Sequence, residues 1–135
     1  MILKITLELT PEHNFRATDG RSREELNPKE LLLYATADCA GLTILSLLKE
    51  HIADVMSLEV TIEGSLSTPT VVAESRFTHF NIIYHAECKD LKEQMVISRA
   101  VNLTHDKYCG LLQMMRQVAP VSHETAIVTT QELNS

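Results

Sequence analysis

The sequence is poor in aromatic residues and has no cluster of basic side chains. Its 135 residues include no Trp, and aromatic residues make up 4% of the chain, so its core has to be aliphatic. The formal net charge is −6, and Arg16, Arg21 and Arg23 are interleaved with Asp19, Glu24 and Glu25. Binding to a phosphate backbone needs clustered Lys and Arg. Nucleic acid is therefore not expected as a partner.

Cysteine is also scarce, with three residues and no CxxC pair. An odd number without that spacing fits neither a disulfide framework nor a zinc finger. The N-terminal residues alternate as a strand does, which is unlike a signal peptide. We therefore expect a cytoplasmic protein whose cysteines are reduced, with no membrane association and no cofactor.

Residues 27–50 are predicted to form one long helix that is apolar on nearly every side. Asn27 suits the cap position and Pro28 the first turn. Asp38 is the one formal charge between Leu31 and Leu48, and at the centre of a membrane span it would cost about 2.5–3.5 kcal/mol. Burial inside protein is the better interpretation, because a helix that is apolar all round must be surrounded.

Cys39 lies in the middle of this helix among small side chains, including Ala35, Ala40 and Gly41. Small residues allow a close backbone approach or leave room for a small molecule beside the thiol. Ordinary burial is the alternative, since free cysteines are among the most buried residues. The spacing alone leaves both interpretations open.

Periodicity predicts an α+β fold with one domain over residues 1–135. The predicted strands are residues 2–10, 13–18, 55–65, 72–86 and 121–131, and the further helices are 91–103 and 105–118. The alternation slips near His79, which indicates a bulge. We expect an antiparallel sheet that packs on one side of the long central helix. A second copy of the chain would cover the other side, so a homodimer is predicted.

Cys109 is predicted to lie in the first turns of the helix over 105–118. The helix N-terminus and Lys107 would both lower its thiol pKa, and burial is again the alternative. If the fold joins Cys39 and Cys109, one can attack an oxidant and the other can resolve the product as a disulfide. Cys88 is interpreted as a packing residue. His105 and Cys109 have the i, i+4 spacing of metal ligands, but no further motif completes a site, and no metal is expected.

Two segments, NPKELLLYATADC and AVNLTHDKYCGLLQMM, occur in that order with RFTHFNIIYHAEC between them. Together they resemble the OsmC/Ohr family of thiol-dependent peroxidases, and within it the YhfA-like branch. The resemblance implies an intertwined homodimer with two active sites at the subunit interface. It also implies that Cys39 attacks an organic hydroperoxide, that Cys109 resolves it, and that a dithiol serves as reductant.

The chain departs from the family pattern at several positions. Lys29 stands where the characterised enzymes have a glutamate, and Glu30 follows one position later, where with an arginine it is expected to hold the thiolate and polarise the peroxide. Arg16 is the nearest candidate for the activating arginine, with Arg21 or Arg23 as alternatives. A charge on Asp38 close to Cys39 would raise the pKa of that thiol. The alternative function is therefore a non-catalytic dimer that binds a small apolar ligand or senses redox state.

Overall fold

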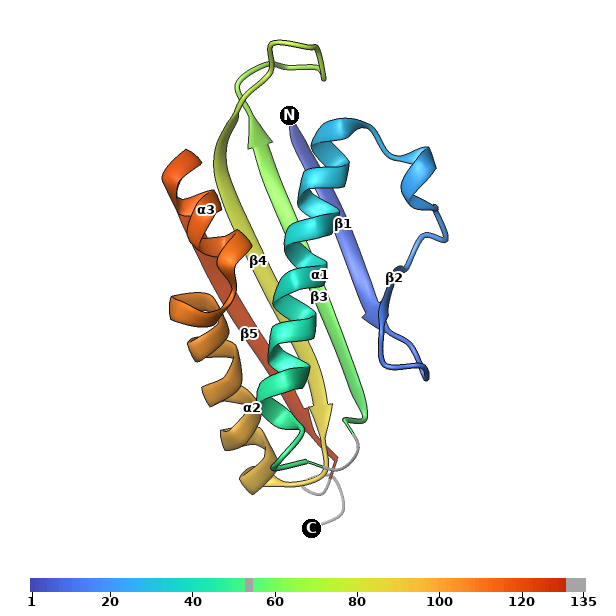
Figure 1. Cartoon of the computed structure of the whole chain (residues 1–135), viewed down its shortest axis with the longest axis vertical. Helices are drawn as coiled ribbons and strands as arrows, with labels where there is room; N and C mark the ends of the chain where they lie inside the picture. Colours follow the sequence, from blue (N-terminus) through green and yellow to red (C-terminus); the bar gives the residue numbers. More distant parts are fainter. Residues whose placement is uncertain (53–54, 131–135) are drawn as a thin grey trace.

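The computed structural model describes residues 1–52 and 55–130, which form a five-stranded sheet with helices on one face (Figure 1). In chain order the regular elements are β1 (Ile2–Leu9), β2 (Phe15–Ala17), α1 (Pro28–Leu48), β3 (Ser57–Leu66), β4 (Phe77–Cys88), α2 (Leu91–Leu103), α3 (Gly110–Val118) and β5 (Val121–Thr129). Two short turns accompany them, the 3₁₀ turn η1 (Arg23–Glu25) and the π turn η2 (Thr104–Tyr108). The predicted α+β class is confirmed.

The strand order in the sheet is β2-β1-β3-β4-β5, and all neighbours are antiparallel except the last pair. β5 runs parallel to β4, so the expected fully antiparallel sheet is wrong at this edge. The reason lies in the connection, since parallel neighbours need a long crossover and α2, η2 and α3 supply it. The alternation of apolar residues does not encode strand direction. Cys109 lies in this crossover, between η2 and α3.

The predicted bulge is present in the long hairpin of β3 and β4. Ser65 pairs with His79, and Leu66 pairs with Phe77, so Thr78 is the extra residue. The predicted strand over 72–86 in fact begins at Phe77, because residues 72–76 lie in a turn. The end of the strand predicted over 121–131 lies outside the described residues.

Helix α1 begins where its capping residues predict. The side chain of Asn27 accepts a hydrogen bond from the N–H of Glu30 at 2.8 Å, and the Glu30 carboxylate accepts one from the N–H of Asn27 at 3.1 Å. The helix is long and apolar enough, by length and composition alone, to cross a membrane. Eight of its residues are nevertheless buried in this chain's own core, as in the core helix of an α+β protein.

The sheet and the other helices leave one stripe of α1 uncovered. Leu31, Ala35, Leu42 and Ser46 are exposed along it, at successive helical spacings of four, seven and four residues. Three of these four side chains are apolar, and Leu42 keeps 44% of its surface. One apolar side of the helix is thus unburied within a single chain.

The second half of the helical prediction needs one correction. Helix α2 packs on the core through Ile97, Ala100 and Val101, while Leu91 and Met95 are exposed. The helix predicted over 105–118 is divided, since α3 begins only at Gly110. The end of α2 at Leu103 is as predicted, and residues 104–108 form the π turn η2 instead of the first turn of α3.

Candidate active site

The sulfur atoms of Cys39 and Cys109 lie 3.2 Å apart, although the residues are separated by 70 positions in the sequence. Cys39 comes from the middle of α1 and Cys109 from the start of α3. The thiol of Cys109 donates a hydrogen bond to the sulfur of Cys39. The two thiols are thus within hydrogen-bond distance of each other.

The turn η2 fixes the position of Cys109. The N–H of Cys109 donates to the carbonyl of Thr104 at 3.1 Å, and its own carbonyl accepts from the N–H of Gln113 at 3.2 Å. The side chain is fully buried. A π turn inserted between two helices is a frequent feature of functional sites, because it redirects the chain without breaking it.

Burial raises the pKa of the Cys109 thiol to about 12. The N–H groups of Leu112 and Leu111, at the start of α3, act in the opposite direction, and the neighbouring Cys39 adds to the increase. Of the two interpretations left open for Cys109, burial is the one that decides its pKa. The helix N-terminus has its expected influence, but loss of solvation outweighs it.

Cys39 is only half-buried and opens onto a hollow of about 590 Å³. The lining residues are Ala35, Asp38, Cys39, Leu42, Thr43, Ser46, Leu47 and Tyr108. Burial raises the pKa of the Asp38 carboxyl, and the charge of Arg23 lowers it. The hollow is thus largely apolar, with the thiol in its wall and one acidic side chain beside it.

Glu30 lies nine residues before Cys39 on α1, which is about 13.5 Å along the helix axis. Its carboxylate accepts hydrogen bonds from the guanidinium of Arg21 at 2.9 Å and from the N–H of Asn27 at 3.1 Å. Arg21 also donates to Asp19 at 2.9 Å. Within the chain this network holds the start of α1, and it does not reach the sulfur atoms.

The side chains of Arg16 and Lys29 are bound to groups away from the two cysteines. Arg16 pairs with Glu8 at 3.0 Å and lies between two buried residues of β2, so it faces away from the helices. The ammonium of Lys29 donates to the carbonyls of Val72 and Ala73. Over the described residues, neither Cys39 nor Cys109 has a basic side chain as hydrogen-bond partner. The structure therefore does not bring Arg16 to the cysteines.

Arg23 is the arginine with a link to the hollow. Its guanidinium lies 5.3 Å from the centre of the Tyr34 ring, and its charge acts on Asp38 in the lining. It was only an alternative in the sequence analysis. Of the three arginines, Arg23 is the one best placed to act on the hollow beside Cys39.

Sequence analysis missed a group of ring side chains that includes the buried residues Tyr84 and His105. His105 stacks on His123 with 3.8 Å between ring centroids, and Tyr84 meets His123 edge-on. Burial and the charges of His123 and Arg116 lower the pKa of His105 to about 4. A signal for Tyr84 was available, since its position in the alternation of β4 places it beside the buried Phe80 and Ile82.

The metal alternative gains no support from this group. His105 packs on a second imidazole, while Cys109 faces another sulfur. In residues 1–52 and 55–130, no three His, Cys, Asp or Glu side chains come together in a way that could hold an ion.

Comparison with known proteins identifies relatives over most of the chain. The family described as OsmC-like protein matches residues 20–124. Protein YhfA of Escherichia coli K12 is 31% identical over 111 residues, which are 82% of this chain and 80% of the relative. Both cysteines lie inside the range that the family matches.

Solved structures show the same fold. An OsmC like protein from Mycoplasma pneumoniae superimposes with a TM-score of 0.62 at 15% identity, covering 95% of this chain and 96% of that one. OhrB of Bacillus subtilis, named an organic hydroperoxide resistance protein, gives a TM-score of 0.55 at 15% identity and covers 93% and 97%. The family match, the identity to YhfA and this shared fold agree: the chain belongs to the OsmC family.

Proposed function

We propose that the protein is a thiol-dependent peroxidase that reduces organic hydroperoxides through Cys39 and Cys109. The observation that carries the proposal is the distance of 3.2 Å between the two sulfurs, one of which opens onto a mostly apolar hollow. The name of the OhrB neighbour, an organic hydroperoxide resistance protein, supports the same class of substrate. Membership of the OsmC family supports a role in redox or stress defence.

The two sulfurs take different steps because their surroundings differ. Cys39 borders the hollow, so its thiolate attacks the distal oxygen of the hydroperoxide and the O–O bond breaks. The oxygen bonded to carbon then takes a proton and leaves as an alcohol. Cys39 is then a sulfenic acid. The Cys109 sulfur attacks the Cys39 sulfur, the S–O bond breaks, and water leaves as the disulfide forms. A dithiol reductant returns both residues to thiols.

A homodimer belongs to this proposal. The uncovered stripe of α1 includes Leu42 and Ala35, which also line the hollow beside Cys39. A second copy seated on this stripe would bury its apolar surface and close the hollow from above. Low solvent access favours an apolar hydroperoxide over hydrogen peroxide. A cytoplasmic location completes the proposal, since it keeps the resting pair reduced.

The test is anaerobic thiol counting before and after one equivalent of cumene hydroperoxide. The chain is compared with Cys39→Ser, Cys109→Ser and, as a matched control, Cys88→Ser. We expect rapid loss of two thiols in the unmodified chain and in Cys88→Ser. Cys109→Ser should trap a sulfenic acid at Cys39, and Cys39→Ser should not react.

Survival of all three thiols in excess hydroperoxide would contradict the peroxidase function. Loss of two thiols with hydrogen peroxide as fast as with cumene hydroperoxide would contradict the preference for an apolar substrate. Sedimentation of the protein as a monomer at micromolar concentration would contradict the dimer.

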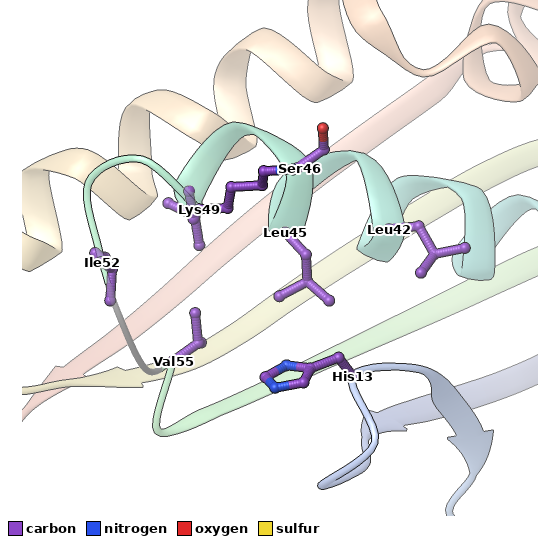
Figure 2. Close-up of a pocket in the computed structure, with 8 residues that line it drawn as sticks. His13, Leu42, Leu45, Ser46, Lys49, Ile52 and Val55 are labelled. Atoms are coloured by element: carbon purple, nitrogen blue, oxygen red, sulfur yellow. The ribbon is translucent and has the colours of Figure 1, made fainter.

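A second candidate function is binding of a small apolar ligand without turnover. A separate hollow of about 360 Å³ lies at the end of α1, where Leu42, Leu45 and Val55 surround the space near His13 (Figure 2). The pairing of Arg16 with Glu8, on the face of β2 away from the helices, also favours this alternative. Binding of a fluorescent fatty acid to a chain whose thiols survive peroxide would support it, and turnover would contradict it.

A further inference from the structure

Two side chains of α3 bind backbone carbonyls of the turn η2. Nε2 of Gln113 donates to the carbonyl of His105 at 3.2 Å. The guanidinium of Arg116 donates to the same carbonyl, and also to that of Asp106 at 3.5 Å. Arg116 donates to Oε1 of Gln113 at 3.1 Å as well, and the two residues lie three positions apart on one face of α3. We call these contacts of Arg116 and Gln113 with the turn the α3 clamp.

Arg116 is half-buried, and over residues 1–52 and 55–130 it forms no ion pair. The planar guanidinium of an arginine is suited to bind two acceptors at once, most often the two oxygens of a carboxylate. Here its donors go to two neighbouring carbonyls of one turn and to Gln113. This use of a charged side chain indicates a turn whose position matters.

The turn η2 is poorly satisfied by its own side chains. Oγ1 of Thr104 and Nδ1 of His105 are buried and have no hydrogen-bond partner among the described residues. Buried polar atoms without partners destabilise the conformation that contains them. Contacts from outside the turn are therefore needed to hold it, and the α3 clamp supplies them.

Cys109 is the joint between the two elements that the α3 clamp connects. It ends η2 and precedes α3 with an extended backbone, at φ −87° and ψ 105°, and Gly110 follows it. Rotation about this joint would move the Cys109 sulfur relative to that of Cys39, which is fixed in the middle of a helix of 21 residues. The α3 clamp spans the joint and so limits this rotation.

We propose that Arg116, together with Gln113, is a positioning residue that keeps the Cys109 sulfur beside Cys39 for the resolving step. The inference rests on the proposed peroxidase function. In that step the Cys109 sulfur attacks the sulfenic sulfur of Cys39, the S–S bond forms, and the S–O bond breaks. The hydroxide leaves with the Cys109 proton as water. Arg116 takes no part in these bond changes and acts through the turn.

The α3 clamp is expected to matter more before the disulfide forms than afterwards. In the reduced form the two sulfurs, 3.2 Å apart, are held together by folding alone. A misplacement of about 1 Å can slow such an intramolecular reaction by about 100-fold. Once the disulfide exists, the covalent bond itself holds Cys109 against α1. Loss of the clamp therefore disfavours the disulfide relative to the two thiols.

The kinetic test is a single turnover with one equivalent of cumene hydroperoxide, quenched at successive times. Dimedone labelling reports the sulfenic acid of Cys39, and non-reducing mass spectrometry reports the disulfide. We expect Arg116→Ala to form the sulfenic acid at the unmodified rate and the disulfide about 10- to 100-fold more slowly. Disulfide formation by Arg116→Ala at the unmodified rate would overturn the inference.

Arg116→Lys separates the bridging contacts from the positive charge. Lysine keeps the charge but lacks the planar fork that reaches two carbonyls. We expect this variant to form the disulfide at least about five-fold more slowly than the unmodified chain. Resolution at the unmodified rate would show that the charge alone is needed, and the positioning role would be wrong.

Two further variants are matched controls that keep the α3 clamp. Arg99→Ala removes an exposed arginine from α2, and Met115→Ala removes a buried side chain from α3. Both should form the disulfide at the unmodified rate, although Met115→Ala lowers the free energy of unfolding. A slowing in either control equal to that in Arg116→Ala would overturn the inference, because loss of charge or general loosening of α3 would then explain it.

A measurement without peroxide separates this inference from the proposed function. Each variant, in a Cys88→Ser background, is equilibrated with mixtures of reduced and oxidised dithiothreitol, and the fraction of disulfide gives the reduction potential of the pair. We expect Arg116→Ala to raise this potential by about 30 to 60 mV, which corresponds to a change of about 10- to 100-fold in the equilibrium constant. An unchanged potential would overturn the positioning role. A raised potential in a chain whose Cys39 does not react with hydroperoxide would support that role and contradict only the peroxidase function.

Discussion

The imidazole of His105 lies stacked on that of His123, with the two planes inclined by 30°. Burial is the main reason why the pKa of His105 is lowered to about 4. In the unfolded chain the same group titrates near its ordinary value of about 6.5. Below that pH the unfolded state binds a proton that the folded state does not bind.

The free energy of unfolding is therefore expected to fall as the pH drops from about 6.5 to about 4. The full loss from this residue is about 3 kcal/mol, most of it already present at pH 5. Urea denaturation at pH 7 and pH 5, at one protein concentration, measures it. His105→Phe keeps an aromatic ring in the stack and should remove this part of the pH dependence. His51→Gln changes an exposed histidine and should keep it.

Oxidation of the cysteine pair is expected to stabilise the fold. A disulfide between Cys39 and Cys109 would close a loop of 70 residues. Constraining the unfolded chain in this way raises the free energy of unfolding by about 4 kcal/mol. Urea denaturation of the oxidised and reduced forms of Cys88→Ala, which retains only this pair, measures the difference. Equal stability of the two forms would show that the native state is strained by the bond.

Gly41 allows α1 to pack closely on β2. A Cβ at this position would lie 2.6 Å from Cζ of Phe15, whose ring is itself buried. We expect Gly41→Ala to lower the free energy of unfolding by about 1–3 kcal/mol, because the ring must move. Gly110→Ala is the matched control, since nothing lies within 4 Å of its added Cβ. Thermal and urea denaturation should show little loss or a small gain there.

Glu30 tests whether the start of α1 has a structural or a chemical role. Glu30→Ala removes the capping contact with Asn27 and the ion pair with Arg21, and should destabilise the protein by about 1–2 kcal/mol. Arg21→Ala removes the ion pairs with Glu30 and Asp19 but keeps the cap at Asn27, and should cost less. Stopped-flow oxidation of Cys39 should stay within about two-fold of the unmodified rate in both variants. A slowing of ten-fold or more would indicate that the carboxylate acts on the thiol.

Sequence reasoning succeeded where local chemistry decides the structure. The cap at Asn27, the slip near His79 and the alternation of β3 and β4 all depend on near neighbours, and each is found where expected. The direction of β5 depends on the length and path of the crossover. The alternation of residues within β5 does not show in which direction the strand runs.

The candidate site shows the same division. The sequence singled out Cys39 and Cys109, and the fold brings them into contact. It left a lowered pKa and ordinary burial both open for Cys109, because a helix N-terminus can be recognised from sequence whereas the burial of one side chain cannot. The position of Arg16, away from the cysteines of its own chain, could not be predicted for a related reason, since alternation in a strand of three residues is too short to show which face it occupies.

The crossover between β4 and β5 has a consequence for the timing of synthesis. Cys39 leaves the ribosome 70 positions before Cys109, and the turn that holds Cys109 lies in the crossover between β4 and β5. Cys39 therefore has its partner sulfur beside it only once this crossover has packed against α1. A partly made chain carries the Cys39 thiol without the sulfur that would resolve it.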